Sequence, residues 1–484
     1  MKTPKELMHM LTHMNDFTYR FNPKTGNFRW REFRGPVDDV YNFWMWLIVW
    51  KDMVRMVLRG PVDVVKALFR YQWFASYLNY PAFVDRATLG MRGEQLRMAR
   101  LQYDRIVKKA TDMLHDTFAA DQNFHKSDKK AKKIVLFDEL VPCEMMAGFP
   151  NLIGLPAQTL PVFLTSILDQ NVVIPYLDAA ENFSIPADVC PLPSSETGCV
   201  LKDDYPKIGA CLISCNMPCD GSVMTSAFQE RYFGLPSHVY AVPTRYTEDE
   251  VQPYAVEELK DMIRFIEETT GETFWIYRMF FYHLSGGMDP RFVDTDRKVN
   301  RIMMRGYEKR RKCVKDMRHR CVEWSCPANF YPDFSIWAQE CWGIYVVAAM
   351  ETLISDVIID TSSHESALRD LALTYQRCTM RKHTKGGHRN VLEELWRICE
   401  LYKCDFVLMY DQISCKGMDG LRGLFEEQAA ERNIRLLWVA QDLLDPRTIS
   451  KREMRNQVNL YMTTVMGEEP VRPDLVDFDD SKSW

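Results

Sequence analysis

The sequence predicts an α/β protein, with two doubly wound (Rossmann-like) parallel-sheet halves and an extra helical N-terminal segment. Two repeated stretches and one contrasting region predict this fold. Residues 210–242 and 404–439 each read as a strand, a loop with a cysteine, a helix and another strand. Residues 1–130 show apolar residues at helical spacing and no such pattern. The chain should therefore pair two similar sheets behind a helical extension.

The predicted N-terminal extension spans residues 1–130. Gly-Pro-Val-Asp occurs at 35–38 and at 60–63, and each copy looks like a helix start because proline is tolerated in a first helical turn. The apolar run from Phe43 to Trp50 is eight residues long, too short to span a bilayer, so it predicts a buried or partner-facing helix. With no secretory signal in sight, we expect a cytoplasmic protein without a membrane span.

The composition excludes some partners and draws attention to the thiols. Lys and Arg number 61 against 66 Asp and Glu among 484 residues, for a formal charge of -5, so no basic field predicts binding to nucleic acid. Fourteen cysteines are many for a cytosolic chain, in which disulfides are rare. Metal or cluster ligation is therefore the alternative to inert core thiols.

A lysine-rich linker at 127–133 marks the start of the first α/β half, which we place at residues 131–295 together with a helical segment. Residues 134–137 read as its first strand. The loop after that strand carries three carboxylates that either do acid–base chemistry or only cap and contact solvent: Asp138, Glu139 and Glu144.

The rest of the first half holds two cysteines on predicted loops. Residues 185–199 are rich in Pro, Ser and Asp, fit no regular element, and place Cys190 on a loop. A strand at 210–214 leads into the loop of Cys219, and residues 246–320 read as helices.

We place the second α/β half at residues 296–466 and an acidic tail at 467–484. The expected elements of this half are a strand at 356–360, a basic loop at 381–389, a helix at 390–402, a strand at 406–410, the loop of Cys415 and a helix at 421–432.

Three cysteines on loops form the candidate metal set: Cys190, Cys219 and Cys415. Ligands of doubly wound sheets lie outside the carboxyl ends of the strands, where Cys219 and Cys415 are expected. Separate single thiolates that a fold brings together suit an iron–sulfur cluster, and three of them leave one iron open to substrate. Plain core thiols remain the alternative, and the rivals as ligands are Cys199, Cys211 and above all Cys215.

Four short motifs resemble those of one known family. Asp411 to Lys416 is similar to its N-R-S-C-K, and Asp442 to Arg447 to its D-x-x-D-P-R. Asn216 to Cys219 resembles its N-N-I-C loop, and Ala187 to Cys190 its I-D-L-C loop. The family is that of 2-hydroxyacyl-CoA dehydratases, including component D of 2-hydroxyglutaryl-CoA dehydratase, and of benzoyl-CoA reductase subunits. The resemblance covers roughly residues 134–466.

This resemblance implies a [4Fe-4S] cluster on Cys190, Cys219 and Cys415. It further implies a lyase that removes water from a 2-hydroxyacyl-CoA by way of a ketyl radical. An ATP-dependent iron–sulfur activator protein would supply the electron, and a smaller homologous cluster-bearing subunit would complete a heterodimer. Two alternatives stay open. One is a benzoyl-CoA-reductase-like subunit that reduces a ring or double bond, and the other is a non-catalytic scaffold with structural thiols.

The acid–base residues depart from the family pattern. Where the dehydratase subunits have serines and a Y-P-E-N glutamate, this chain has Asp138 and Glu139 and, at the second place, Ala157 and Gln158. Asp138, Glu139 and Glu144 are then the carboxylates placed to take over proton transfer, and the altered set favours the reducing alternative.

The basic loop before the helix at 390–402 is the candidate site for the phosphates of coenzyme A. Phosphate binds well at helix N-termini, and the loop supplies Arg381, Lys385 and Arg389. A solvated loop without a ligand is the alternative.

Overall fold

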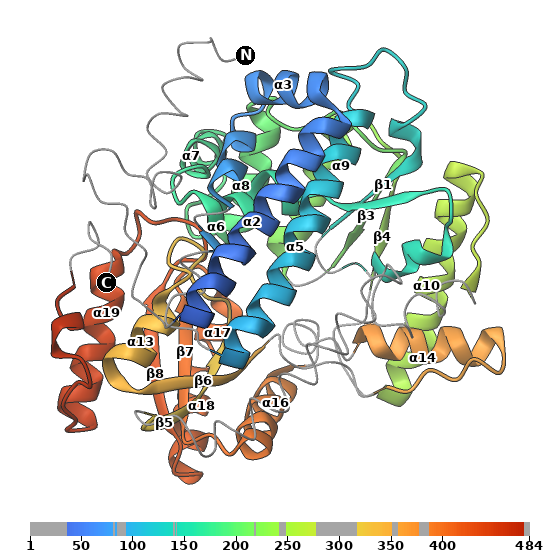
Figure 1. The fold of residues 1–484 in the computed structure, drawn as a ribbon. Coiled ribbons are helices and arrows are strands. Elements are labelled where there is room, and N and C mark those ends of the chain that lie inside the picture. The colour runs from blue at the N-terminus through green and yellow to red at the C-terminus, as the bar shows by residue number, and fades with distance from the viewer. Residues whose placement is uncertain are drawn as a thin grey trace.

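The computed structural model describes residues 36–80, 83–84, 93–138, 141, 143–216, 219–241, 248–276, 317–350, 357–376 and 387–478. It confirms the predicted fold class, since two four-stranded parallel sheets lie in the two halves of the chain. Long N-terminal helices lie beside the sheets (Figure 1).

Four parallel strands form the first sheet: β1 (Ile134–Phe137), β2 (Ile153–Pro156), β3 (Cys211–Cys215) and β4 (Ser237–Tyr240). Their order is β2-β1-β3-β4. Every residue of β1 and β3 is buried, as in a sheet that helices cover on both faces, which explains why both read as continuous apolar runs. The strand predicted at 134–137 is confirmed at both ends, and the one predicted at 210–214 begins one residue later.

The second sheet repeats this plan with β5 (His319–Trp324), β6 (Ile344–Ala349), β7 (Phe406–Gln412) and β8 (Arg435–Gln441), in the order β6-β5-β7-β8. One strand prediction and one helix prediction are wrong here. Residues 357–360, expected to belong to a strand, have no regular structure, and the edge strand β6 comes earlier. His319 and Arg320, expected to end a helix, begin β5 because Asp405 binds the backbone N–H of Arg320 beside the start of β7.

Helices connect the strands in both halves, because parallel strands need a crossover. One prediction is wrong: residues 185–199 were expected to lack regular structure, but a helix begins at Pro191, where proline suits the first turn. The helices predicted at 390–402 and 421–432 are confirmed. The first half contains η2 (Ala131–Lys133), η3 (Cys143–Gly148), η4 (Thr159–Phe163), α6 (Leu164–Leu168), α7 (Ile174–Asn182), α8 (Pro191–Leu201), α9 (Asp220–Phe233) and α10 (Glu248–Thr270).

The second half contains α13 (Phe334–Trp342), α14 (His364–Gln376), α16 (Gly387–Tyr402), α17 (Lys416–Asp419), α18 (Arg422–Glu431), α19 (Lys451–Leu460), η7 (Tyr461–Val465) and η8 (Pro473–Leu475). Of these, α14 leaves its own sheet and packs beside α10, far from β7 (Figure 1). Buried side chains of α14 such as Leu371 join the hydrophobic core of the first half.

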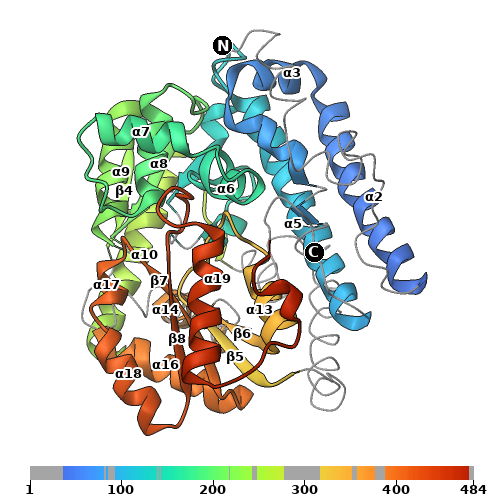
Figure 2. The ribbon, with the colours of Figure 1, turned by 90° about the vertical axis from the view of Figure 1, so that its left-hand side faces the viewer.

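The N-terminal helices are α2 (Pro36–Arg59), α3 (Pro61–Arg70), η1 (Trp73–Asn79) and α5 (Gly93–Ala120). Helices α2 and α5 run side by side in both views (Figures 1 and 2). Trp73 is fully buried, stacks on Tyr71 and donates a hydrogen bond from Nε1 to the carbonyl of Asp204 at 2.9 Å. The extension therefore shares a core with the first half. Within the described helices, none is both long and apolar enough to cross a bilayer.

Candidate functional site

The carboxyl edges of the two sheets carry a cysteine in the same place. In both sheets the first strand of the half lies beside the third, so the connections diverge between them and leave room above the edge. Cys219 follows β3 and is the N-cap of α9, and Cys415 follows β7 and is the N-cap of α17. The two thiols therefore occupy matching loops of the two halves.

Backbone hydrogen bonds hold the loop of Cys415 tightly. The Cys415 N–H donates to the carbonyl of Gln412 at 2.8 Å, and the Cys415 carbonyl accepts from the N–H of Met418 at 3.1 Å. The residue is half-buried. Burial raises the pKa of the Cys415 thiol, and negative charge on Cys219 or Asp419 raises it further.

Cys190 lies outside both sheets, as the N-cap of α8. Burial raises the pKa of its thiol well above the ordinary value, and charge on Cys219, Cys415 and Asp442 adds to the shift. Because these groups act on Cys190 through space, the third thiol lies near the two that follow the strands. All three cysteines are free.

Two contacts bring the three loops together. A Cβ added at Gly221 would lie 3.4 Å from Cys219 Sγ and 3.7 Å from Val189 Cγ1, so the start of α9 lies close to both Cys219 and the residue before Cys190. Lys416 Nζ lies 2.5 Å from Asp188 Oδ2, which joins the residue after Cys415 to the same segment. The structure thus brings Cys190, Cys219 and Cys415 to one seam between the halves.

The donor chemistry at this seam fits an iron–sulfur cluster. Thiolates are the ligands of such clusters, and the N-termini of α8 and α9, where two of the thiols lie, favour negative charge. Among the described residues, no three Cys, His, Asp or Glu side chains converge tightly enough to hold a single metal ion. A cluster of four irons separates its thiolate ligands more widely than one ion does. Since burial disfavours the free thiolates of Cys190 and Cys415, a bound cation would stabilise them.

A buried amide network supports the loop of Cys415, and the sequence analysis missed it. Gln441 Nε2 donates to Gln412 Oε1 at 3.1 Å and to the carbonyl of Cys326 at 2.8 Å. Gln412 Nε2 donates to Ser414 Oγ at 2.8 Å. The sequence did contain a signal for this network, since each of the two apolar strands ends with a glutamine next to an aspartate. A polar side chain that is buried at such a place needs a hydrogen-bond partner.

Asp442 is the carboxyl group that closes this network, with Oδ2 at 3.4 Å from Gln412 Nε2. Its Oδ1 accepts from the backbone N–H groups of Leu444 at 2.9 Å and Asp445 at 2.7 Å. Burial raises the pKa of Asp442 to about 6, although the two N–H groups oppose that shift. Asp442 can therefore exchange a proton close to neutral pH.

Asp138 is the one predicted acid–base residue whose side chain the structure describes. It follows β1, is buried, and accepts hydrogen bonds from Gln158 Nε2 at 3.0 Å and Ser226 Oγ at 3.3 Å. These two donors hold the Asp138 carboxyl group in place. None of the described residues donates a hydrogen bond to the buried Oε1 of Gln158. Glu139 and the side chain of Glu144 lie outside the described residues.

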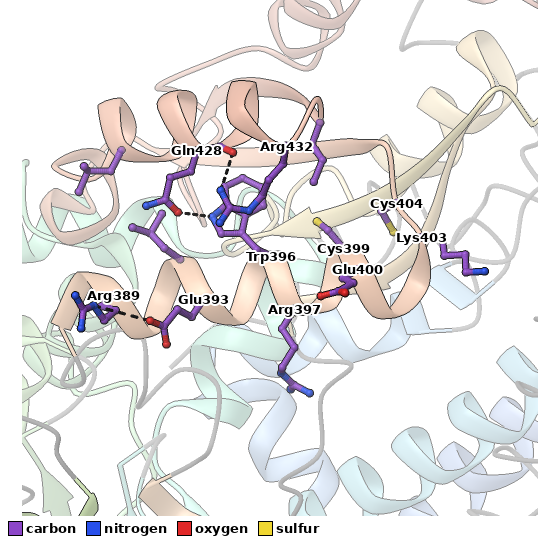
Figure 3. A pocket seen from close by; sticks show the side chains of 13 residues that line it. Arg389, Glu393, Trp396, Arg397, Cys399, Glu400, Lys403, Cys404, Gln428 and Arg432 are labelled. Atoms are coloured by element: carbon purple, nitrogen blue, oxygen red, sulfur yellow. Dashed lines mark hydrogen bonds and ion pairs between the residues drawn. The ribbon is translucent and has the colours of Figure 1, made fainter.

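The three predicted coenzyme A residues are only partly described. Arg381 and Lys385 lie outside the described residues. Arg389 is exposed, and its Nε lies 3.9 Å from Glu393 Oε1 on the next turn of α16. It lines one end of a pocket of about 820 Å³ between α16 and α18 (Figure 3).

That pocket is separate from the three thiol loops, none of whose residues line it. In this pocket the guanidinium of Arg432 lies over the ring of Trp396, 5.2 Å from the ring centre. Trp396 Nε1 donates a hydrogen bond to Gln428 Oε1 at 2.7 Å (Figure 3). Arg397 is held by Glu394 at 2.9 Å. These cations already have partners, so the pocket is a weaker candidate for the active site than the seam.

Comparison with known proteins agrees with the motifs. A family model described as 2-hydroxyglutaryl-CoA dehydratase, D-component, matches residues 171–280 and 275–462. The matched segments cover more than half of the chain and include all three thiol loops. A comparison with curated proteins found no match.

Proposed function

The chain belongs to the 2-hydroxyglutaryl-CoA dehydratase D-component family, and from this premise we propose that it is an iron–sulfur subunit that removes water from a 2-hydroxyacyl-CoA. Family membership makes it a dehydratase component and, in broad class, a lyase. The observation that carries the finer proposal is the meeting of Cys190, Cys219 and Cys415 at one seam between the two sheets.

In this proposal the three thiolates hold a [4Fe-4S] cluster. A cluster held by these thiolates would supply one-electron transfer at low potential. The chain's own contribution is to bury the thiols, to hold the loop of Cys415 through Gln412 and Gln441, and to place proton-transferring groups nearby.

Asp138 and Asp442 are the carboxyl groups proposed for proton transfer, with Glu139 and Glu144 as the further candidates. Asp138 receives two hydrogen bonds that orient its carboxyl group, and it is proposed as the base. Asp442, with a pKa of about 6, carries a proton more readily and suits the acid. The proposal thus gives one carboxyl group each role, a common arrangement in acid–base enzymes.

Electron delivery and partners complete the proposal. An ATP-dependent iron–sulfur activator supplies the electron, and a smaller homologous subunit binds beside this chain. Helix α2 exposes a row of apolar side chains on one side, including Trp44 and Leu58, which suits a partner-facing helix. Arg389, with Arg381 and Lys385, is proposed to bind the phosphates of coenzyme A.

Iron and sulfide analysis of the anaerobically purified protein tests the proposal. Replacing Cys190, Cys219 or Cys415 by Ala should each remove most of the iron. Cys399→Ala is the matched control, because Cys399 is a buried thiol of the second half, away from the seam, and should leave the iron content unchanged. A colourless wild-type protein without iron would instead support the scaffold alternative.

Product analysis separates dehydration from reduction. Ala157 stands where the dehydratases have the glutamate of Y-P-E-N, and the neighbouring Gln158 donates a hydrogen bond to Asp138. The loss of that glutamate favours the benzoyl-CoA-reductase-like alternative. With activator, ATP and an acyl-CoA, the dehydratase yields an enoyl thioester and the reductase a reduced acyl group.

A further inference from the structure

The Asp442–Arg447 turn follows β8 directly. The side chains of Asp442 and Asp445 shape this turn by accepting hydrogen bonds from the backbone N–H groups of residues 444, 445 and 447. Asp445 also holds the guanidinium of Arg447 with both oxygens, at 2.9 Å from Nε and 2.8 Å from Nη2. The turn therefore presents Arg447 in a single orientation.

Arg447 reaches from the second half to the first. Its Nη1 donates to Asp178 Oδ1 at 2.7 Å, and its Nη2 lies 3.8 Å from Glu181 Oε1. Both acids lie on α7, the helix that precedes the segment ending in Cys190. This contact ties α7 to the carboxyl edge of the second sheet.

Helix α7 cannot shift without moving α8. A Cβ added at Gly198 of α8 would lie 1.8 Å from the carbonyl oxygen of Tyr176, so the two helix backbones touch at this glycine. Cys190 is the N-cap of α8. A change in the position of α7 would therefore also move the thiol of Cys190.

A second ion pair holds the same segment from the other side. Lys416, next to Cys415, binds Asp188, two residues before Cys190. The loop after β7 thus contacts the segment just before Cys190, and the loop after β8 contacts α7, where this connection begins. Cys190 has no matching strand of its own to place it, whereas Cys219 and Cys415 follow β3 and β7 directly.

We infer that Arg447 and Lys416 are positioning residues that set the place of the Cys190 thiol relative to Cys415 across the two halves. The inference rests on the proposed function for its purpose, a three-thiolate cluster site built from both halves. Its physical content concerns the distance between two thiols and can be measured without the cluster.

The test is thiol cross-linking in the full-length, cluster-free chain. Dibromobimane bridges neighbouring thiols, and peptide mass spectrometry assigns the Cys190–Cys415 product. Arg447→Gln removes the charge and should slow this cross-link by about threefold, the range expected for losing a partly exposed ion pair. Arg452→Gln is the matched control, because its partner Asp477 lies in the same half, at 2.7 Å, and it should leave the rate unchanged.

Charge reversal tests the second contact. Lys416→Asp should slow the cross-link, and adding Asp188→Lys should restore it, which a residue with only a general effect on folding would not do. Asp178→Asn removes the same partner from Arg447 while leaving the pairing with Asp445 intact, so it decides the question if Arg447→Gln does not fold. Rates equal to wild type in Arg447→Gln and Asp178→Asn would overturn the inference.

Iron content keeps the two proposals apart. A wild-type chain that forms the Cys190–Cys415 cross-link but takes up no iron would refute the proposed function and leave the positioning role standing. Iron uptake that all these variants retain, together with unchanged cross-linking, would refute the positioning role alone.

Discussion

The two halves share one strand order but differ in how they use their crossovers. In the first half, α7 and α8 stay at the seam and bring a third thiol to it. In the second half, α14 leaves its own sheet for the core around α10. The matching thiols Cys219 and Cys415 come from what the halves have in common, whereas Cys190 comes from what only the first half has. A repeated fold thus supplies two of the proposed ligands, and a departure from the repeat supplies the third.

The largest effect is expected from a substitution that disrupts the packing of α7 on α8 in the first half. Gly198→Ala should destabilise the protein by on the order of 3 kcal/mol or more, because the new methyl group would meet the backbone of Tyr176 at 1.8 Å and force α7 and α8 apart. Chemical unfolding followed by circular dichroism measures the change.

A glycine of the second half provides the control. Gly423 lies in α18, and no described residue comes within 4 Å of an added Cβ there, so Gly423→Ala should be neutral or stabilise by about 0.5 kcal/mol through helix propensity. Equal destabilisation by both substitutions would show that the close packing of α7 on α8 is not special.

Asp442 sharpens the comparison of the two carboxyl edges. Its pKa of about 6 in the folded chain exceeds the ordinary value, so its contribution to stability is present at low pH and is lost as the pH rises through about 6. Asp442→Asn still accepts the backbone hydrogen bonds but does not ionise. Between about pH 4 and pH 7, the wild type should lose on the order of 2 kcal/mol more stability than the variant. Parallel pH profiles of the two unfolding free energies would contradict the assignment.

A smaller effect is expected at the amino edge of the second sheet. His319 Nε2 lies 2.8 Å from Glu468 Oε1, and His319 Nδ1 lies 3.3 Å from Asp405 Oδ2. Burial alone would lower the pKa of His319, but the hydrogen bonds that its ring donates to these two carboxylates raise it. The contribution is full below the unfolded-state value of about 6.5 and is lost as the pH rises through the raised folded value. His319→Gln should cost on the order of 1 kcal/mol near pH 5.5 and less near pH 9, measured by urea unfolding.

The buried strands and the two strand-following thiols could be predicted because local pattern decides them. A strand covered on both faces must be apolar throughout, so residues 134–137 and 406–410 were recognisable. Residue pairs separated along the chain could not be found in this way. The contact of Lys416 with Asp188 and that of Arg447 with Asp178 join residues more than 200 positions apart, and nothing in either local sequence names its partner. Strand β5 was missed for a related reason. Its first residues continue a basic run that is typical of a solvated helix, and only the pairing with the neighbouring strands makes them a strand.

By itself, the sequence determined the fully buried strands, several of the helices, and the placing of Cys219 and Cys415 on loops that follow strands, since these depend on neighbours along the chain. Only the tertiary structure decided that α8 begins at Pro191, that α14 joins the core of the first half, and that Cys190 meets the other two thiols. Those outcomes depend on which surfaces are buried against each other and on charges brought together across the seam, and neither is a property of any one segment.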